Sequence, residues 1–235
     1  MPSVIRLFKM YLKENIKGIC QRFGLDYREF LDAFEADEIS ELTLYDLEAV
    51  SEEYEVALDD LLFKRSFPDQ TLSDRMKKIK LLMLDVDGVM TDGGMYFTES
   101  GDQMKKFNTK DGMAILHLTS NDFQVAIISS GFRGDAVKRR ADMLGIQHCS
   151  VSRESKITRL ANICATLRIT HDQVAIIGDD INDLEIMRSV GVSFCPSDAV
   201  KAVKDEADVI LSRKGGEGCV REMIDNYLLD QPLTK

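Results

Sequence analysis

Two aspartates spaced by one residue follow a short apolar run in the segment LLMLDVDGVMTDGG, residues 81–94. Carboxylates this close repel each other unless a positive group lies between them or one of them holds a proton. Asp85 and Asp87 are therefore typical of three situations: a divalent cation site, a pair of acids with separate chemical roles, or a turn that ends a strand.

Further polar residues that could do chemistry follow other apolar runs. Ser129 ends the run VAIIS, Lys156 stands at the expected start of a helix, and the motif GDDIND supplies Asp179, Asp180 and Asp183 after the run VAII. Each residue alone is ordinary, because Asp and Gly form turns and a single lysine is usually solvated. Gathered at one sheet edge, the five carboxylates would repel strongly, so the set predicts a hard cation with oxygen ligands.

Short apolar runs alternate with amphipathic stretches from residue 80 onward. Continuous apolarity predicts strands buried on both faces, as in a parallel sheet covered by helices. The expected strands are 81–84, 125–129, 174–177, 191–194 and 208–211, and the expected helices lie near 111–121, 133–144, 153–167 and 181–189. This pattern indicates a doubly wound α/β fold, in which ligands bind beyond the carboxyl ends of the strands. A β-hairpin is expected to project at 93–108, where two β-capable stretches flank ESGD.

The first 75 residues have a different composition from the rest. They carry 9 basic and 17 acidic residues, against 21 and 23 in the remainder. Apolar residues recur there at helical spacing, and Asp26 and Thr43 are suited to cap helices. We expect a small all-α domain at 1–66, a linker at 67–78 and the α/β domain at 79–235.

The joint order of these motifs resembles the haloacid dehalogenase superfamily of phosphatases over about residues 79–228. LDVDGV, IIS, Lys156 and IGDDIND stand for its four motifs. Within the superfamily the chain resembles the capless branch that acts on 3-deoxy-D-manno-octulosonate 8-phosphate or nonulosonate 9-phosphates, through DVDGVMTDGG, the hairpin, KKFNTKDG and the tail RKGGEGCVRE. The resemblance implies a Rossmann-like fold and a Mg²⁺-dependent phosphatase of a small sugar-acid phosphate.

The resemblance also implies roles for the acids. Asp85 would attack phosphorus and form an aspartyl-phosphate, while Asp87 would protonate the leaving sugar oxygen and then activate water. Mg²⁺ would be held by the Asp85 carboxylate, the Asp87 backbone carbonyl and Asp179. Asp180 and Asp183 would orient that shell or hold the motif lysine, and the strand-end serine and that lysine would bind the phosphoryl group.

The spacing of the motifs leaves no room for a separate cap domain. Only 41 residues separate Asp87 from Ser129, and 26 separate Ser129 from Lys156. The resembling enzymes form a tetramer in which a neighbour's hairpin closes the site, so a homotetramer is expected. Four basic residues are candidates to bind a substrate carboxylate, although each could equally be an ordinary exposed base: Lys105, Lys106, Lys110 and Arg213.

Residues 12–62 resemble repressor-type helix-turn-helix domains. The alternative function is therefore a DNA-binding or protein-docking regulator with a metabolite-sensing domain. DNA binding requires a basic face, but residues 26–60 contain 14 acids and one base, and the place of the recognition helix is taken by EADEISE. Nucleic acid is thus not expected as a partner, and oligomerisation or protein docking is the better hypothesis.

The overall composition excludes several other classes. Apolar residues make up 44% and charged residues 30%, as in a globular domain. The chain shows no uninterrupted apolar run for a signal peptide or membrane span, so a cytoplasmic location is expected. Five scattered cysteines without C-x-x-C argue against a disulfide framework or structural zinc. The P-loop pattern is absent, and three histidines in no motif disfavour histidine or zinc chemistry.

Overall fold

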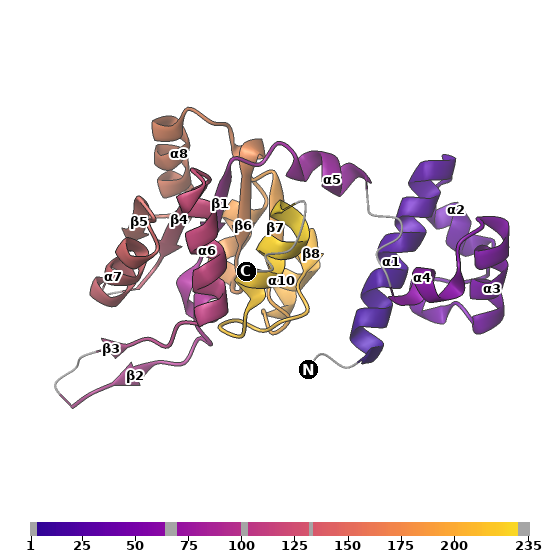
Figure 1. The fold of residues 1–235 in the computed structure, drawn as a ribbon, viewed down its shortest axis with the longest axis horizontal. Coiled ribbons are helices and arrows are strands. Elements are labelled where there is room, and N and C mark those ends of the chain that lie inside the picture. Colours follow the sequence, from indigo (N-terminus) through magenta and orange to yellow (C-terminus); the bar gives the residue numbers. More distant parts are fainter. Residues whose placement is uncertain (1–3, 64–69, 100–102, 132–133, 230–235) are drawn as a thin grey trace. The chain divides into compact units, whose positions relative to one another are not determined.

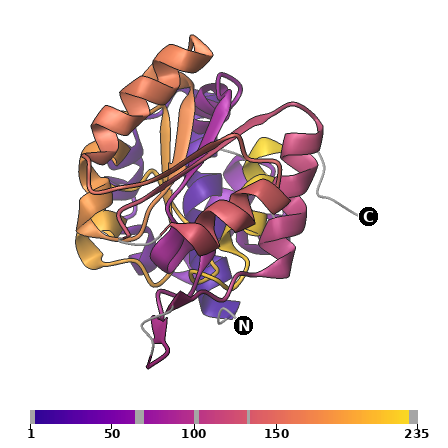
Figure 2. The same cartoon turned by 90° about the vertical axis from the view of Figure 1, so that its left-hand side faces the viewer.

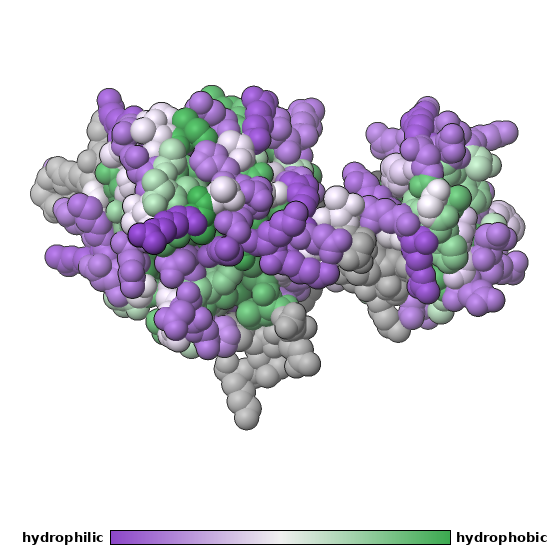
Figure 3. All heavy atoms as spheres, turned by 90° about the horizontal axis from the view of Figure 1, so that it is seen from above, coloured by the Kyte–Doolittle hydropathy of each residue, from purple (hydrophilic) through white to green (hydrophobic). Residues whose placement is uncertain are grey.

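The computed structural model of the chain describes residues 4–63, 70–99, 103–131 and 134–229. The chain divides into two compact units, Met1–Asp74 and Arg75–Lys235, each with its own apolar core (Figure 1). Among the described residues, no helix combines the length and the apolarity needed to cross a bilayer. Hydrophilic residues cover most of the surface seen in Figure 3, with smaller hydrophobic areas between them.

The N-terminal unit is built from one long helix and several shorter ones around one apolar cluster. Asp26 accepts hydrogen bonds from two backbone N–H groups at the start of its helix, and Thr43 caps the next helix, as the sequence predicted. The core includes Ile16, Ile19 and Val50, none of which is exposed. The helices are α1 (Val4–Phe23), α2 (Tyr27–Asp32), α3 (Leu44–Glu53) and α4 (Leu58–Phe63), and α5 (Gln70–Met76) spans the boundary between the two units.

The segment between α2 and α3 holds a single 3-10 turn at Ile39–Glu41. This is the place where a helix-turn-helix domain would carry its recognition helix. The turn has no buried residue, so no apolar stripe is available to pack a longer helix. Helix α5 was not expected from the sequence, because the range 67–78 is polar; its buried residues are Leu72 and Met76.

The second unit contains a six-stranded parallel sheet in the order β5-β4-β1-β6-β7-β8. The strands are β1 (Leu81–Leu84), β4 (Gln124–Ser129), β5 (His148–Val151), β6 (Val174–Ile177), β7 (Val192–Cys195) and β8 (Val209–Ile210). All residues of β1, β6 and β7 are buried, which explains their continuous apolar sequences. The edge strand β5 escaped prediction because it is half-buried and reads HCSV.

Helices cover both faces of this sheet, as Figure 2 shows. One face packs against α8 (Lys156–Leu167), α9 (Leu184–Met187) and α10 (Lys201–Glu206). The other face is covered by α6 (Thr109–Ser120), α7 (Asp135–Met143) and α11 (Cys219–Met223). A π-helical segment, Ile224–Leu228, continues α11. The predicted doubly wound α/β architecture is therefore confirmed.

The predicted hairpin is also present, as β2 (Tyr96–Phe97) and β3 (Gln103–Met104). The strands are antiparallel, with Tyr96 opposite Met104. The hairpin projects away from the sheet (Figure 1). Tyr96, Phe97 and Met104 are about half exposed or more, at 48%, 57% and 59%, so the apolar side chains of these strands have little cover within one chain.

Candidate active site

Three neighbouring strands bring the predicted site residues to one edge of the sheet. Asp85 follows β1, Ser129 ends β4, and Asp179 lies two residues beyond β6. Because these strands are adjacent and parallel, their carboxyl ends meet. Lys156 begins α8, directly after the loop that leaves the same end of β5.

Lys156 lies between two of the carboxylates. Its Nζ is 3.0 Å from Asp85 Oδ1 and 2.6 Å from Asp183 Oδ1, and all three side chains are buried. Burial acts to lower the pKa of Lys156, but the two carboxylates outweigh it and the pKa is raised. The lysine is thus a fixed positive charge at the end of β1.

Asp183 connects this lysine to the loop that follows β6. Its Oδ2 accepts hydrogen bonds from the backbone N–H groups of Asp179, at 3.1 Å, and Asp180, at 3.4 Å. Gly178 is needed beneath it, because a Cβ there would lie 2.6 Å from the Cβ of Asp183. Asp183 therefore holds both Lys156 and the backbone of the acidic loop, while the exposed Asp180 caps the turn Ile181–Asp183.

The acid cluster fits a bound cation. Oxygen atoms of Asp85, Asp179 and Asp183 lie within 4.8 Å of one another, and Asp179 Oδ1 is buried without a hydrogen-bond partner among the described residues. Burial, followed by repulsion from Asp183, raises the pKa of Asp85 to about 7. Burial, followed by repulsion from Asp85, raises the pKa of Asp179 to about 8. A hard divalent cation would relieve this repulsion and satisfy the free oxygen.

Asp87 lies in the turn Val86–Met90, apart from this cluster. The turn depends on Gly88, whose φ is +87°, and a Cβ there would lie 2.0 Å from Asp179 Oδ2. The Asp87 side chain is 39% exposed, and its Oδ1 accepts a hydrogen bond from Lys105 Nζ. Lys105, a candidate from the sequence to bind a substrate carboxylate, thus contacts this acid.

Ser129 is buried at the end of β4 and is held by a residue that the sequence analysis missed. Its Oγ accepts from Gly131 N at 3.3 Å, and its carbonyl oxygen accepts from Arg159 Nη1 at 2.9 Å. Arg159 also donates to the carbonyl of Ser150 on β5. The only sequence signal for Arg159 is its position three residues after Lys156, on the same side of α8.

The glycine-rich tail packs against the Asp87 turn. A Cβ on Gly215 would lie 1.9 Å from the carbonyl oxygen of Gly88, and Gly216 N donates to the Val89 carbonyl at 2.9 Å. Asn108, from the KKFNTKDG segment, donates to the Gly216 carbonyl at 3.1 Å. Two motifs far apart in the sequence therefore meet behind the site.

Two carboxylates fix the ends of this tail loop, and neither was predicted. Glu222 accepts from the backbone N–H groups of Ser212, at 2.7 Å, and Arg213, at 2.8 Å. Asp111, buried on α6, accepts from Arg221 N at 2.7 Å. The tail loop is thus tied to both α6 and α11.

The other three basic candidates lie outside the buried acid cluster. Lys106 is exposed, with Nζ 3.1 Å from Asp92 Oδ2. Arg213 is exposed beside the tail loop and donates to the Glu217 carbonyl at 3.4 Å. Lys110 is exposed in the first turn of α6. Their predicted contact with a substrate stays a prediction.

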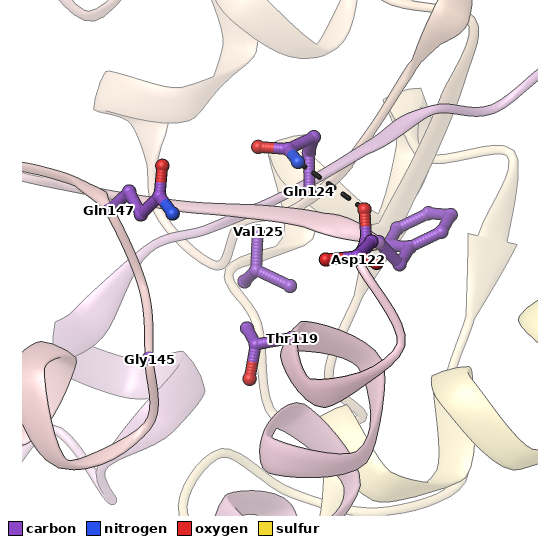
Figure 4. Close-up of a pocket in the computed structure, with 7 residues that line it drawn as sticks. Thr119, Asp122, Gln124, Val125, Gly145 and Gln147 are labelled. Atoms are coloured by element: carbon purple, nitrogen blue, oxygen red, sulfur yellow. Dashed lines mark hydrogen bonds between the residues drawn. The ribbon is translucent and has the colours of Figure 1, made fainter.

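A small pocket lies at the opposite edge of the sheet, at the amino ends of the strands (Figure 4). It is lined by Thr119, Asp122, Phe123, Gln124, Val125, Gly145 and Gln147. It contains none of the acids, lysines or glycines described above. The carboxyl edge is therefore the candidate site.

Comparison with known proteins agrees with this geometry. The haloacid dehalogenase-like hydrolase family matches residues 151–223. The 3-deoxy-D-manno-octulosonate 8-phosphate phosphatase of Yersinia pestis is 41% identical over 157 residues, which cover 67% of this chain and 83% of that protein. A crystal structure of that phosphatase from Yersinia pestis has a TM-score of 0.66 at 39% identity and covers 68% of this chain and 86% of its own.

The corresponding phosphatase of Moraxella catarrhalis was solved with a magnesium ion, a phosphate ion and a KDO molecule. It has a TM-score of 0.64 at 32% identity and covers 68% of this chain and 91% of its own. The superfamily predicted from the four motifs is confirmed by these relatives. The chain belongs to the haloacid dehalogenase-like hydrolases and is a phosphoric monoester hydrolase.

Proposed function

We propose that the chain is a Mg²⁺-dependent phosphatase that hydrolyses a small sugar-acid phosphate through an aspartyl-phosphate intermediate. The observation that carries the proposal is the position of Asp85, buried at the end of β1 with Lys156 3.0 Å away and Asp179 beside it. A nucleophilic carboxylate with a fixed ammonium and a cation site is what phosphoryl transfer requires.

Asp85 supplies the attacking oxygen. Its bond to phosphorus forms as the bond from phosphorus to the sugar oxygen breaks, and the electron pair leaves with that oxygen. Lys156 favours the ionised form of Asp85 before the attack, against the burial and the repulsion that raise its pKa, and would balance charge on the phosphoryl oxygens during the attack. Ser129, whose carbonyl accepts a hydrogen bond from Arg159, would donate to the same phosphoryl group.

Asp87 transfers the protons, first to the leaving group and then from water. In the first step it donates a proton to the departing sugar oxygen, and in the second it removes a proton from the water that cleaves the aspartyl-phosphate. Its side chain is 39% exposed, which leaves room for water and substrate, whereas Asp85 is buried. The two acids of the opening motif therefore have separate roles.

The cation site belongs to the same proposal. Asp85, Asp179 and the backbone carbonyl of Asp87 would hold Mg²⁺, with Asp183 keeping the acidic loop in place. When bound, Mg²⁺ neutralises developing charge on the phosphoryl oxygens. The predicted cofactor agrees with the acid cluster and with the magnesium ion in the Moraxella relative.

The substrate class is inferred from the relatives. The Yersinia relative is a 3-deoxy-D-manno-octulosonate 8-phosphate phosphatase, and the Moraxella structure contains KDO. We infer 3-deoxy-D-manno-octulosonate 8-phosphate or a nonulosonate 9-phosphate as the substrate. Lys106, Lys110 and Arg213 are the exposed cations available for its carboxylate, from this chain or a neighbouring copy.

Assembly and location complete the proposal. The exposed apolar hairpin supports a homotetramer in which it covers a neighbour's site. All five cysteines are free, which supports a cytoplasmic location. The regulator alternative rests on the N-terminal unit, whose single 3-10 turn and acidic sequence offer little for DNA.

Replacement of the nucleophile tests the proposal directly. Asp85→Asn should abolish phosphate release from 3-deoxy-D-manno-octulosonate 8-phosphate while the circular dichroism spectrum stays unchanged. EDTA should abolish release from the parent, and added Mg²⁺ should restore it. Turnover by Asp85→Asn, or full activity in EDTA, would refute the mechanism. A panel of phosphorylated sugars and sugar acids would then rank the substrates.

A further inference from the structure

The two acids of the D-x-D motif are each bound by a different lysine. Lys156 Nζ lies 3.0 Å from Asp85 Oδ1, and Lys105 Nζ donates to Asp87 Oδ1. The mutual repulsion that the sequence predicts is thus relieved by two ammonium groups that come from separate elements. Lys156 is one of the four family motifs, whereas Lys105 is not, so the motifs do not account for its contact with Asp87.

Lys105 is unusually buried for a lysine. Its side chain is 10% exposed, whereas that of the adjacent Lys106 is 68% exposed and pairs with Asp92 at the surface. A buried ammonium loses hydration that only a close carboxylate can replace. The contact with Asp87, which is itself 39% exposed, is therefore better shielded from water than an ordinary surface ion pair, which contributes little.

We propose that Lys105 is a positioning residue for the acid–base group. By holding Asp87 Oδ1, it fixes the carboxylate so that the second oxygen, Oδ2, is the one presented to the leaving oxygen and then to water. A carboxylate with one oxygen bound cannot rotate freely, and correct orientation is a large part of proton-transfer catalysis. The inference rests on the proposed function, because it assumes that Asp87 carries the proton.

The hairpin takes on a second role in this arrangement. Lys105 follows β3 directly, and the pairing of Tyr96 with Met104 sets where that strand ends. The base of the hairpin therefore delivers a cation to the site of its own chain. The alternative role, in which Lys105 binds a substrate carboxylate, makes different predictions.

A double-mutant cycle separates these roles. Lys105→Met, Asp87→Asn and the double variant are compared with the parent on 3-deoxy-D-manno-octulosonate 8-phosphate and on p-nitrophenyl phosphate. Lys105→Met should lower kcat about 10- to 100-fold on the sugar-acid phosphate, with KM changed less than about threefold. In the Asp87→Asn background the same change should cost less than about twofold, because the group it positions is gone.

Three further measurements complete the test. On p-nitrophenyl phosphate, whose leaving group needs no proton, the losses of both single variants should shrink together. Mg²⁺ affinity by calorimetry should be unchanged in Lys105→Met, and Lys105→Arg should keep most of the kcat because it keeps the charge. The control is Lys201→Met, which breaks a surface pair with Asp205 on α10, where the lysine is 87% exposed; it should match the parent.

The outcomes are distinguishable. Three results would each overturn the positioning role of Lys105. They are a kcat loss in the double variant equal to the product of the two single losses, an effect of Lys105→Met on KM alone, and a loss of Mg²⁺ binding in Lys105→Met. Unimpaired turnover by Lys105→Met beside a defective Asp87→Asn would do the same. Full activity of Asp87→Asn itself would instead refute the acid–base step of the proposed function.

Discussion

At the scale of single residues, Gly88 shows how closely the site is built. Its φ of +87° lies in the left-handed region, which residues with a Cβ rarely adopt. A Cβ at position 88 would also lie 2.0 Å from Asp179 Oδ2. In addition, the carbonyl oxygen of Gly88 lies so close to residue 215 that only glycine fits there. The turn that carries Asp87 and the acid that is expected to bind Mg²⁺ therefore share one tight contact.

Gly88→Ala should weaken Mg²⁺ binding more than it weakens the fold. The left-handed conformation costs about 1–2 kcal/mol for any residue with a Cβ, and the added methyl group must push the Asp179 carboxylate from its place. We expect Mg²⁺ affinity, measured by calorimetry, to fall by more than about tenfold, the equivalent of about 1.4 kcal/mol. Gly24→Ala is the control, because Gly24 has φ +69° and a Cβ added there would have no atom within 4 Å apart from its chain neighbours. An equal Mg²⁺ affinity in Gly88→Ala and the parent would contradict this account.

At the scale of elements, the fully buried strands were predictable, whereas the half-buried edge strand β5 and the contacts between loops were not. β1 and β6 consist of buried apolar residues, which give a continuous signal in the sequence. The D-x-D and GDDIND motifs follow strands directly, so the sheet alone places them. The contacts of Lys105 with Asp87 and of Asp111 with Arg221 could not be predicted, because the two partners lie 18 and 110 residues apart in the sequence. No periodicity encodes such pairs.

Asp111 links α6 to α11 and should give a measurable pH dependence. Burial raises its pKa from 3.8 to about 6, against the opposing effect of the Arg221 N–H. The folded chain therefore holds this proton up to a higher pH than the unfolded chain does. The contribution of Asp111 to the free energy of unfolding is fully present below pH 3.8 and is lost as the pH rises through 6. The loss is about 3 kcal/mol at most.

Asp111→Asn tests this linkage, since the amide oxygen can still accept from Arg221 N. The free energy of unfolding of this variant, compared with that of the parent at the same pH, should increase from pH 4 to pH 7, as urea titrations would show. Asp111→Ala removes the acceptor and should cost about 1–3 kcal/mol throughout that range. If the Asn variant were as destabilised as the Ala variant at pH 7, the ionised carboxylate would be supporting the fold instead.

At the scale of the whole molecule, the two units have different surfaces. The N-terminal unit contributes most of the net negative charge, and its helices enclose a core of their own. The second unit contains the complete acid cluster and both lysines of the D-x-D motif. The proposed phosphatase site therefore belongs to Arg75–Lys235, and the proposed cover over it is the hairpin of a neighbouring copy.

Assembly should supply this cover, which makes substrate enclosure depend on the hairpin. Tyr96 and Phe97 are 48% and 57% exposed, so replacing both with serine removes little packing from a single chain. Sedimentation should show a tetramer for the parent and smaller species for the double variant. KM for the sugar-acid phosphate should rise about tenfold or more, because a loss of about 1.4 kcal/mol of binding free energy weakens binding tenfold. KM for p-nitrophenyl phosphate should be nearly unchanged, because this substrate needs little enclosure.

Tyr45→Ser, at an 83% exposed position in the N-terminal unit, is the control for loss of an exposed aromatic residue. A parent that is monomeric and fully active would exclude closure by a neighbour, and the chemistry at Asp85 would then have to proceed in an open site.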